Sequence, residues 1–249
     1  MTLTGFTNQH PYRSSLVFLL IVLFVDIAIG VINGIFLMGS LLQVGVEDLI
    51  LIIIGIFLLT RLDWWGKAGY TTGIRLGQIP LFILPLAVAL FMLGQGFQVT
   101  APVTILSFAA LTLVIGFAEE TYFRGLILTA LLPTGTIRGV VLSSLLFAAP
   151  HLLNIIGGVW DPFFTIVDSI AAFGLGMTLA AIRLRTGSIW PLVGIHALFD
   201  FSSLIFLGGI EVPAQSPQDL FMSVLLGIVF VIYGLFLLRR ERIGGNETM

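Results

Sequence analysis

The sequence predicts an all-α membrane protein, a polytopic bundle of about eight transmembrane helices. Of the 249 residues, 58% are hydrophobic and only 10% are charged, whereas soluble proteins are about 25% charged. The mean hydropathy is +1.12. The net charge of −2 gives no reason to expect a nucleic-acid partner. The chain has no cysteine, which excludes disulfides, thiolate metal sites and a Cys nucleophile.

Apolar segments recur along the whole chain and are separated by short loops. A helix needs about 20 apolar residues to cross a bilayer, so the second and third segments are near the lower limit. The first segment is too long for the core of a signal peptide, and we expect it to be retained as a span. The predicted spans are 15–38, 45–62, 78–94, 102–132, 138–153, 164–182, 188–207 and 219–238.

The basic residues predict an orientation for these spans. Cytoplasmic loops of membrane proteins are enriched in Lys and Arg. The four loops that would lie outside, 39–45, 95–101, 154–163 and 208–218, contain neither residue type. Both termini are therefore predicted to be cytoplasmic.

No internal repeat, low-complexity run or soluble insert divides the chain. We therefore expect a single domain over 1–249, with a motif-bearing core at 102–207. The last residues, 239–249, are polar and are predicted to form a cytoplasmic tail.

Three ionisable residues, Glu119, Glu120 and Arg124, stand within six positions inside the fourth apolar segment. A charge at membrane depth is costly and needs a partner or a function. On a helix Glu120 and Arg124 share a face and can pair, whereas Glu119 points about 100° away from Glu120. One Arg needs only one carboxylate, so Glu119 is left for another role. The alternative is that both carboxylates merely neutralise Arg124.

Two of the three histidines, His151 and His196, also lie in hydrophobic segments. Pro150 removes a backbone donor, so we expect it to bend or end the fifth span just before His151. A freed carbonyl there suits a polar cavity. Taken alone, His151 is better explained as a histidine at the outer interface that is satisfied by water or by a carbonyl.

The seventh span carries a second polar pair. Ser188 as a cap and Pro191 in the first turn predict that a helix starts here. On that helix His196 and Asp200 are four residues apart and project from one face. Such a pair is either functional or an interhelical contact in which a carboxylate holds an imidazole.

The combination says more than any one residue. Glu119, His151, His196 and Asp200 lie on three different spans that a bundle could bring to one point. A Glu beside a His can act as a general base on water, and a second His can donate to a developing oxyanion. This set suits hydrolysis of a peptide bond. It also resembles a two-His, one-Glu metal site, in which bound water would be the nucleophile.

Other hydrolase signatures are missing. The chain contains no His-Glu-x-x-His, so the zincin arrangement is absent. It contains no Gly-x-Ser-x-Gly either, which makes serine catalysis the weaker hypothesis. Asp26 and Asp168 lie in apolar segments, but neither has a context that indicates an aspartyl protease pair. We assign Asp26 no role.

Three motifs resemble those of a known family in order and spacing: Glu119-Glu120-x-x-x-Arg124, Phe147-x-x-x-His151 and His196-x-x-x-Asp200. They resemble the motifs of the CPBP family. It comprises CAAX prenyl endopeptidases and bacteriocin-processing or self-immunity membrane proteins, also called Abi proteins. The resemblance covers roughly residues 105–205.

The resemblance implies an α-helical intramembrane endopeptidase with eight spans. By motif position, Glu119 and His151 would activate the attacking water. His196 and Asp200 would stabilise the oxyanion. The supporting residues would be Glu120, Arg124 and Phe147.

Asp200 departs from the family pattern, which often has Asn at this position. An amide can donate to an oxyanion, but an ionised carboxylate cannot. Asp200 must then be protonated, hold His196 as an acceptor, or bind a cation. We expect no required cofactor. A divalent metal such as zinc, bound by Glu119, His151 and His196, is the alternative.

The expected activity is hydrolysis of a peptide bond in a membrane-associated peptide or lipidated protein. We expect a multi-pass integral protein of a prokaryotic cell membrane, with the lipid bilayer as its surroundings. Two alternatives remain. Intramembrane carboxylates and histidines also suit a proton-coupled transporter. The second alternative is that the chain is a non-catalytic membrane partner of the bacteriocin-immunity type.

Overall fold

The computed structural model describes residues 3–156, 161–210 and 216–244. Within these ranges every regular element is helical and no strand occurs. Eight of the helical segments are long and apolar enough to cross a membrane. The predicted all-α bundle of about eight spans is therefore confirmed, and the chain is a multi-pass integral membrane protein.

Five spans are single helices, and three are built from consecutive short elements. The third span joins η1 to α4, the fourth runs from α5 through η3, and the fifth runs from α7 into α8. The elements are α1 (Leu3–Gln9), α2 (Pro11–Phe36), α3 (Ser40–Leu62), η1 (Leu76–Phe82), α4 (Ile83–Leu93), α5 (Pro102–Glu120), η2 (Thr121–Ile127), α6 (Leu128–Leu131), η3 (Leu132–Thr134), α7 (Thr136–Ala148), η4 (Pro150–Leu152), α8 (Leu153–Ile156), α9 (Pro162–Thr186), α10 (Trp190–Leu207) and α11 (Pro217–Gly244).

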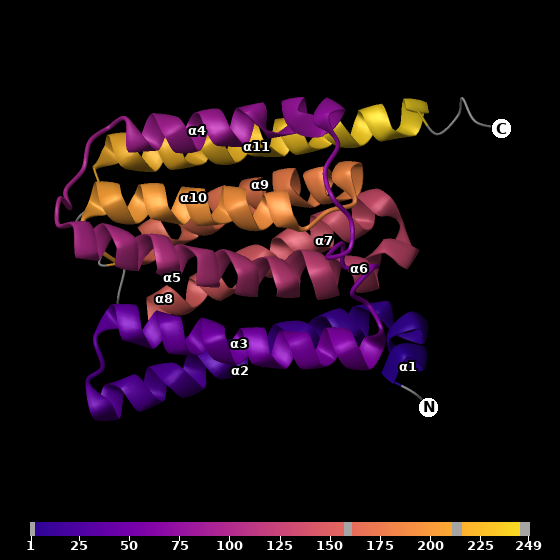
Figure 1. Cartoon of the computed structure of the whole chain (residues 1–249), viewed down its shortest axis with the longest axis horizontal. Helices are drawn as coiled ribbons and strands as arrows, with labels where there is room; N and C mark the ends of the chain where they lie inside the picture. Colours follow the sequence, from indigo (N-terminus) through magenta and orange to yellow (C-terminus); the bar gives the residue numbers. More distant parts are fainter. Residues whose placement is uncertain (1–2, 157–160, 211–215, 245–249) are drawn as a thin grey trace.

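The helices lie side by side in layers (Figure 1). The hairpin of α2 and α3 forms one side of the bundle, α4 and α11 form the opposite side, and α5, α7, α9 and α10 lie between them. Helix α1 and the end of α11 lie at the same end of the bundle. This arrangement fits an even number of spans. The cytoplasmic placement of that end stays a prediction.

Helix α9 is the centre of the bundle. About 61% of its membrane window is buried, against 50% for α10 and at most 33% for each other span. Small residues let α11 approach it closely, because a Cβ added at Gly174 would overlap the backbone of Gly227. Close backbone approach at glycines is the usual way in which membrane helices pack, since lipid removes the hydrophobic driving force.

Local signals predicted some helix ends correctly and others not. Pro150 ends the regular helix of the fifth span as expected: α7 stops at Ala148. The predicted cap at Ser188 is wrong, because α10 starts at Trp190 and no side chain caps it. The Ser188 hydroxyl is instead buried without a partner among the described residues. Helix α11 continues to Gly244, into the predicted tail, and residues 245–249 lie outside the described part of the chain.

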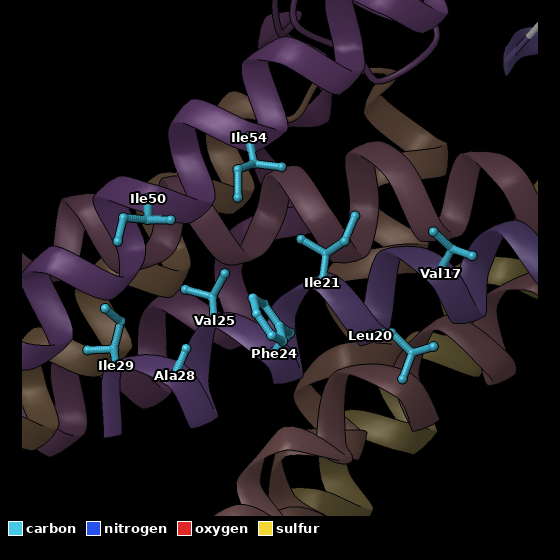
Figure 2. Close-up of a pocket in the computed structure, with 9 residues that line it drawn as sticks. All are labelled: Val17, Leu20, Ile21, Phe24, Val25, Ala28, Ile29, Ile50 and Ile54. Atoms are coloured by element: carbon cyan, nitrogen blue, oxygen red, sulfur yellow. The ribbon is translucent and has the colours of Figure 1, made fainter. Parts of the chain in front are cut away.

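An apolar groove of about 560 Å³ runs along α2 and α3 (Figure 2). Its walls carry only aliphatic and Phe side chains, so it offers no chemistry for hydrolysis. A groove of this composition on an outer hairpin suits contact with lipid chains. The lining residues are Val17, Leu20, Ile21, Phe24, Val25, Ala28, Ile29, Ile50 and Ile54.

Candidate active site

The fourth span changes its winding where the charged stretch begins. Helix α5 ends at Glu120, and the next seven residues, Thr121–Ile127, form a π-helix whose side chains are all buried. Single π-helical turns inside α-helices are rare and occur frequently at functional sites. Glu119 and Glu120 lie in the last turn before this change, and Arg124 lies inside the π-helical segment.

Glu120 is the buried anchor of the site. One of its oxygens, Oε1, lies 2.6 Å from Arg124 Nη1 and 2.9 Å from His196 Nδ1. Glu120 and Arg124 are 0% and 1% exposed, and His196 is 4% exposed. The predicted pair of Glu120 and Arg124 is therefore present. The contact with His196 adds a second task for Glu120, because it fixes the orientation of that imidazole.

Arg124 is buried and has two further contacts besides Glu120. Its guanidinium carbon lies 4.1 Å above the ring of Phe147, and Nη2 donates to the Gly176 carbonyl at 3.5 Å. A cation over an aromatic face is stabilised by the ring quadrupole, most strongly where water is excluded. Phe147 and Glu120 together thus hold the buried charge.

Glu119 and Asp200 approach the other nitrogen of the same histidine. His196 Nε2 lies 3.6 Å from Glu119 Oε2 and 3.7 Å from Asp200 Oδ2. The side chains of Glu119 and Asp200 are about 30% exposed, whereas that of His196 is about 5% exposed. The expected shared face of His196 and Asp200 is confirmed. The open side of the cluster is formed by the two carboxyl groups.

His151 lies next to this cluster and has a different partner. Its Nδ1 is 3.0 Å from Asp168 Oδ2 on α9. Its ring and that of His196 both contact Phe147 edge-on, with ring centroids 5.9 and 5.6 Å away. Within the described residues no hydrogen bond or ion pair joins His151 to Glu119. The structure thus brings Glu119, His196 and Asp200 together and sets His151 beside them across an aromatic ring.

The sequence reasoning gave Asp168 no role, yet it is the partner of His151. Its side chain is about 28% exposed and comes from the central helix. A carboxylate in the middle of an apolar span is the signal that could have found it. The pairing itself depends on how α9 packs against η4, which the sequence does not reveal.

The loop 63–75 is hydrogen-bonded to α9 and to the start of η2 at one end of the site. Arg183 of α9 donates to the carbonyls of Lys67 and Ala68 at 2.7 and 3.1 Å. The Tyr70 hydroxyl is hydrogen-bonded to the Thr121 hydroxyl, the first residue of the π-helix. Burial raises the pKa of Tyr70 to about 12, so this hydroxyl stays protonated at neutral pH. The loop therefore helps to hold η2, the segment that carries Arg124, in position.

Glu119, His151 and His196 do not converge as a zinc ligand set would. A carboxyl group holds Nδ1 of each histidine, Asp168 for His151 and Glu120 for His196, and each Nε2 is left available, as is also common in metal-ligating histidines. In the part of the chain that the structure describes, no three His, Asp or Glu side chains form a group that could hold a metal ion.

The motif-bearing region can be compared with known families. Residues 101–202 match the family model described as type II CAAX prenyl endopeptidase Rce1-like. The core is a CAAX protease domain of the CPBP family. This match confirms the family that the three motifs indicated and supports a membrane protease of the CAAX type in general. A search of the curated proteins found no match. Helices α2, α3, α4 and α11 lie outside the matched CAAX protease region.

Proposed function

We propose that this chain is an intramembrane endopeptidase that cleaves a peptide bond in a membrane-associated or lipidated protein. The observation that supports this most is the meeting of Glu119, His196 and Asp200, with the neutralised pair of Glu120 and Arg124 behind them. The arrangement separates an accessible carboxylate from a buried one. The accessible one is free to do chemistry.

In this proposal Glu119 is the general base. It takes a proton from a water molecule, whose oxygen attacks the carbonyl carbon of the scissile bond. Glu119 then returns the proton to the leaving nitrogen as the carbon–nitrogen bond breaks. His151, whose Nδ1 is held by Asp168, has Nε2 left to bind and orient the water.

His196 stabilises the negative oxygen of the tetrahedral intermediate. Its Nδ1–H donates to Glu120, so the imidazole presents Nε2 toward Glu119 and Asp200. A doubly protonated His196 has Nε2–H as a donor for the oxyanion. Asp200, which cannot donate when ionised, acts as the counter-charge that orients this ring. This role differs from that of the Asn often found at this position.

A cleavage assay with metal analysis tests the proposal. Purified protein in proteoliposomes is given membrane-anchored fluorogenic peptides, including prenylated and unprenylated peptides that end in Cys-aliphatic-aliphatic-X. We expect cleavage of a subset, and His196→Ala should lower kcat about 10²- to 10³-fold. Cleavage should survive a chelator. Activity that a chelator abolishes and zinc restores would favour the metal alternative. If the wild type cleaves none of the peptides, the proposed endopeptidase activity is rejected.

A further inference from the structure

Helix α3 carries a second pair of adjacent carboxyl groups, Glu47 and Asp48. As on α5, the two point about 100° apart. The Glu47 side chain is hydrogen-bonded to Asp26 of α2. Two carboxyl groups can share a hydrogen bond only when one of them is protonated, so this contact ties Glu47 to the α2–α3 hairpin. Asp48 is left to point elsewhere.

Asp48 belongs to the stripe of α3 that faces the bundle. The buried residues of α3 follow helical spacing, and all except Asp48 are apolar: Asp48, Leu51, Gly55, Leu59 and Leu62. A Cβ on Gly55 would lie 3.0 Å from the Thr121 side chain of η2, and one on Gly45 would lie 3.6 Å from Leu111 of α5. Asp48 stands between these two contacts. It therefore faces α5 in the stretch that leads to Glu119.

The electrostatic surroundings agree with this placement. The charged side chains that act on Asp48 are Glu119, Asp26, Asp200 and His196, with Glu119 acting most strongly. Asp48 thus lies on the side of α3 that faces the candidate active site. It lies outside residues 101–202, which match the CAAX protease family.

Asp48 is buried without a partner that could satisfy it. The residue is only 5% exposed, and among the described residues it forms no hydrogen bond or ion pair. Buried polar groups nearly always have a hydrogen-bond partner, and an exception needs an explanation. The neighbouring carboxylates cannot donate when ionised. No donor reaches Asp48 from the described residues, and its oxygens are not among the fully enclosed side-chain atoms without a partner. A bound molecule can therefore supply the donor.

A peptide substrate supplies such a donor. An extended segment at membrane depth has unpaired backbone N–H groups, each of which is costly to leave unsatisfied. A hollow of about 360 Å³ lies along the α3–α5 seam, toward the N-terminal ends of both helices from Asp48 and Glu119. It is lined by Leu41, Leu42, Ser107, Ala110, Leu111 and Val114. A peptide running along this seam would pass Asp48 before it reaches Glu119.

We propose that Asp48 is a substrate-binding residue whose carboxyl oxygen accepts a backbone N–H of the peptide held at Glu119. This inference rests on the proposed peptidase function. It assigns α3, which lies outside the family match, a share in holding the substrate. Asp48 then corresponds to Glu119: in each pair of adjacent carboxyl groups, one residue is held by another side chain and the other contacts the substrate.

The test compares Asp48→Leu with Asp48→Asn. Leucine has a similar size, removes the acceptor and continues the apolar stripe, so the variant should fold at least as well as the wild type. Asparagine keeps one acceptor oxygen. For the prenylated peptide of the assay above, Asp48→Leu should raise KM about tenfold or more with kcat within about threefold, and Asp48→Asn should stay within about threefold. Asp26→Asn is the matched control and should change neither constant.

A second measurement identifies the contact without turnover. Binding of the same peptide to Glu119→Gln is followed by fluorescence anisotropy, with one backbone amide N-methylated at a time. One methylation should weaken binding about tenfold, and the same methylation should have no further effect once Asp48→Leu is added. Additive losses at every position would mean that Asp48 holds water or serves packing, and would overturn the assignment. A third outcome is that one methylation weakens binding only while Asp48 is present, but the wild type cleaves no peptide. This result would reject the proposed peptidase function and retain the Asp48 contact. No binding to the wild type would overturn both.

Discussion

Glu119 and Glu120, which are neighbours at the end of α5, have opposite surroundings. Glu120 is buried between Arg124 and His196, whereas the Glu119 side chain is about 30% exposed. The difference follows from the 100° step of a helix, which turns one carboxyl toward the bundle core and the other toward the open side. The structure therefore predicts that the two residues fail in different ways when they are changed.

Glu120→Gln should destabilise the protein, because Arg124 would remain buried without its counter-charge. Breaking a buried pair by removing one partner costs about 3 kcal/mol or more, which lowers Tm by roughly 10 °C in a chain of this size. Thermal unfolding in detergent measures this. Glu119→Gln is the matched control and should leave Tm within about 2 °C. Equal stability of both variants would contradict the division of roles.

The sequence predicted local pairs better than distant ones. The contacts of Glu120 with Arg124 and of His196 with Asp200 follow from a spacing of four residues on a helix. The contact between Glu120 and His196 joins residues 76 positions apart. It depends on the packing of α5 against α10, which no local pattern specifies. The same holds for Asp168, whose pairing with His151 was missed.

At the scale of the elements, η2 and the loop 63–75 act as one unit. The π-helix widens the chain where Arg124 must reach Glu120, and the loop holds its first residue through Tyr70 and Thr121. The proline break before His151 was predictable because Pro acts locally. The π-helix was not, since its residues carry no breaker that marks the change. Ser188 shows the limit of cap patterns, because α10 begins only at Trp190 and the Ser188 hydroxyl accepts no backbone N–H.

Tyr70→Phe should lower activity without unfolding the protein. Loss of one hydrogen bond costs about 1 kcal/mol, and looser positioning of η2 should reduce kcat/KM about three- to tenfold. Tyr233→Phe is the control, because its hydroxyl donates to the Leu81 carbonyl at 3.2 Å on the outer layer of α11. Both variants should lose similar stability. Identical kcat/KM values for the two would show that the loop does not position the site.

For the whole molecule, the number of spans was predictable and their arrangement was not. A bilayer demands about 20 apolar residues for each helix, so every span is visible in the sequence. The central place of α9 depends on close contacts such as Gly174 with Gly227, which only the folded structure reveals. The orientation rests on the absence of Lys and Arg from four loops and remains a prediction.

Single cysteines can test that orientation, because the natural chain has none. Lys67→Cys lies in the loop 63–75, predicted to be cytoplasmic, and Gln95→Cys lies in a loop predicted to be outside. Both positions are exposed. In intact cells a membrane-impermeant maleimide should label only Gln95→Cys, and permeabilised cells should label both. The reverse pattern would place the loop 63–75 on the outer side and contradict the predicted orientation.

The most direct test of the account is the kcat/KM of Glu119→Gln in proteoliposomes, measured on a peptide that the wild type cleaves. Glutamine keeps the size of the side chain and removes its ability to take a proton from water. The account predicts a loss of about 10²- to 10⁴-fold, with the protein still folded and its substrate affinity retained. Cleavage by Glu119→Gln within about threefold of the wild type would contradict the central claim that Glu119 activates the water.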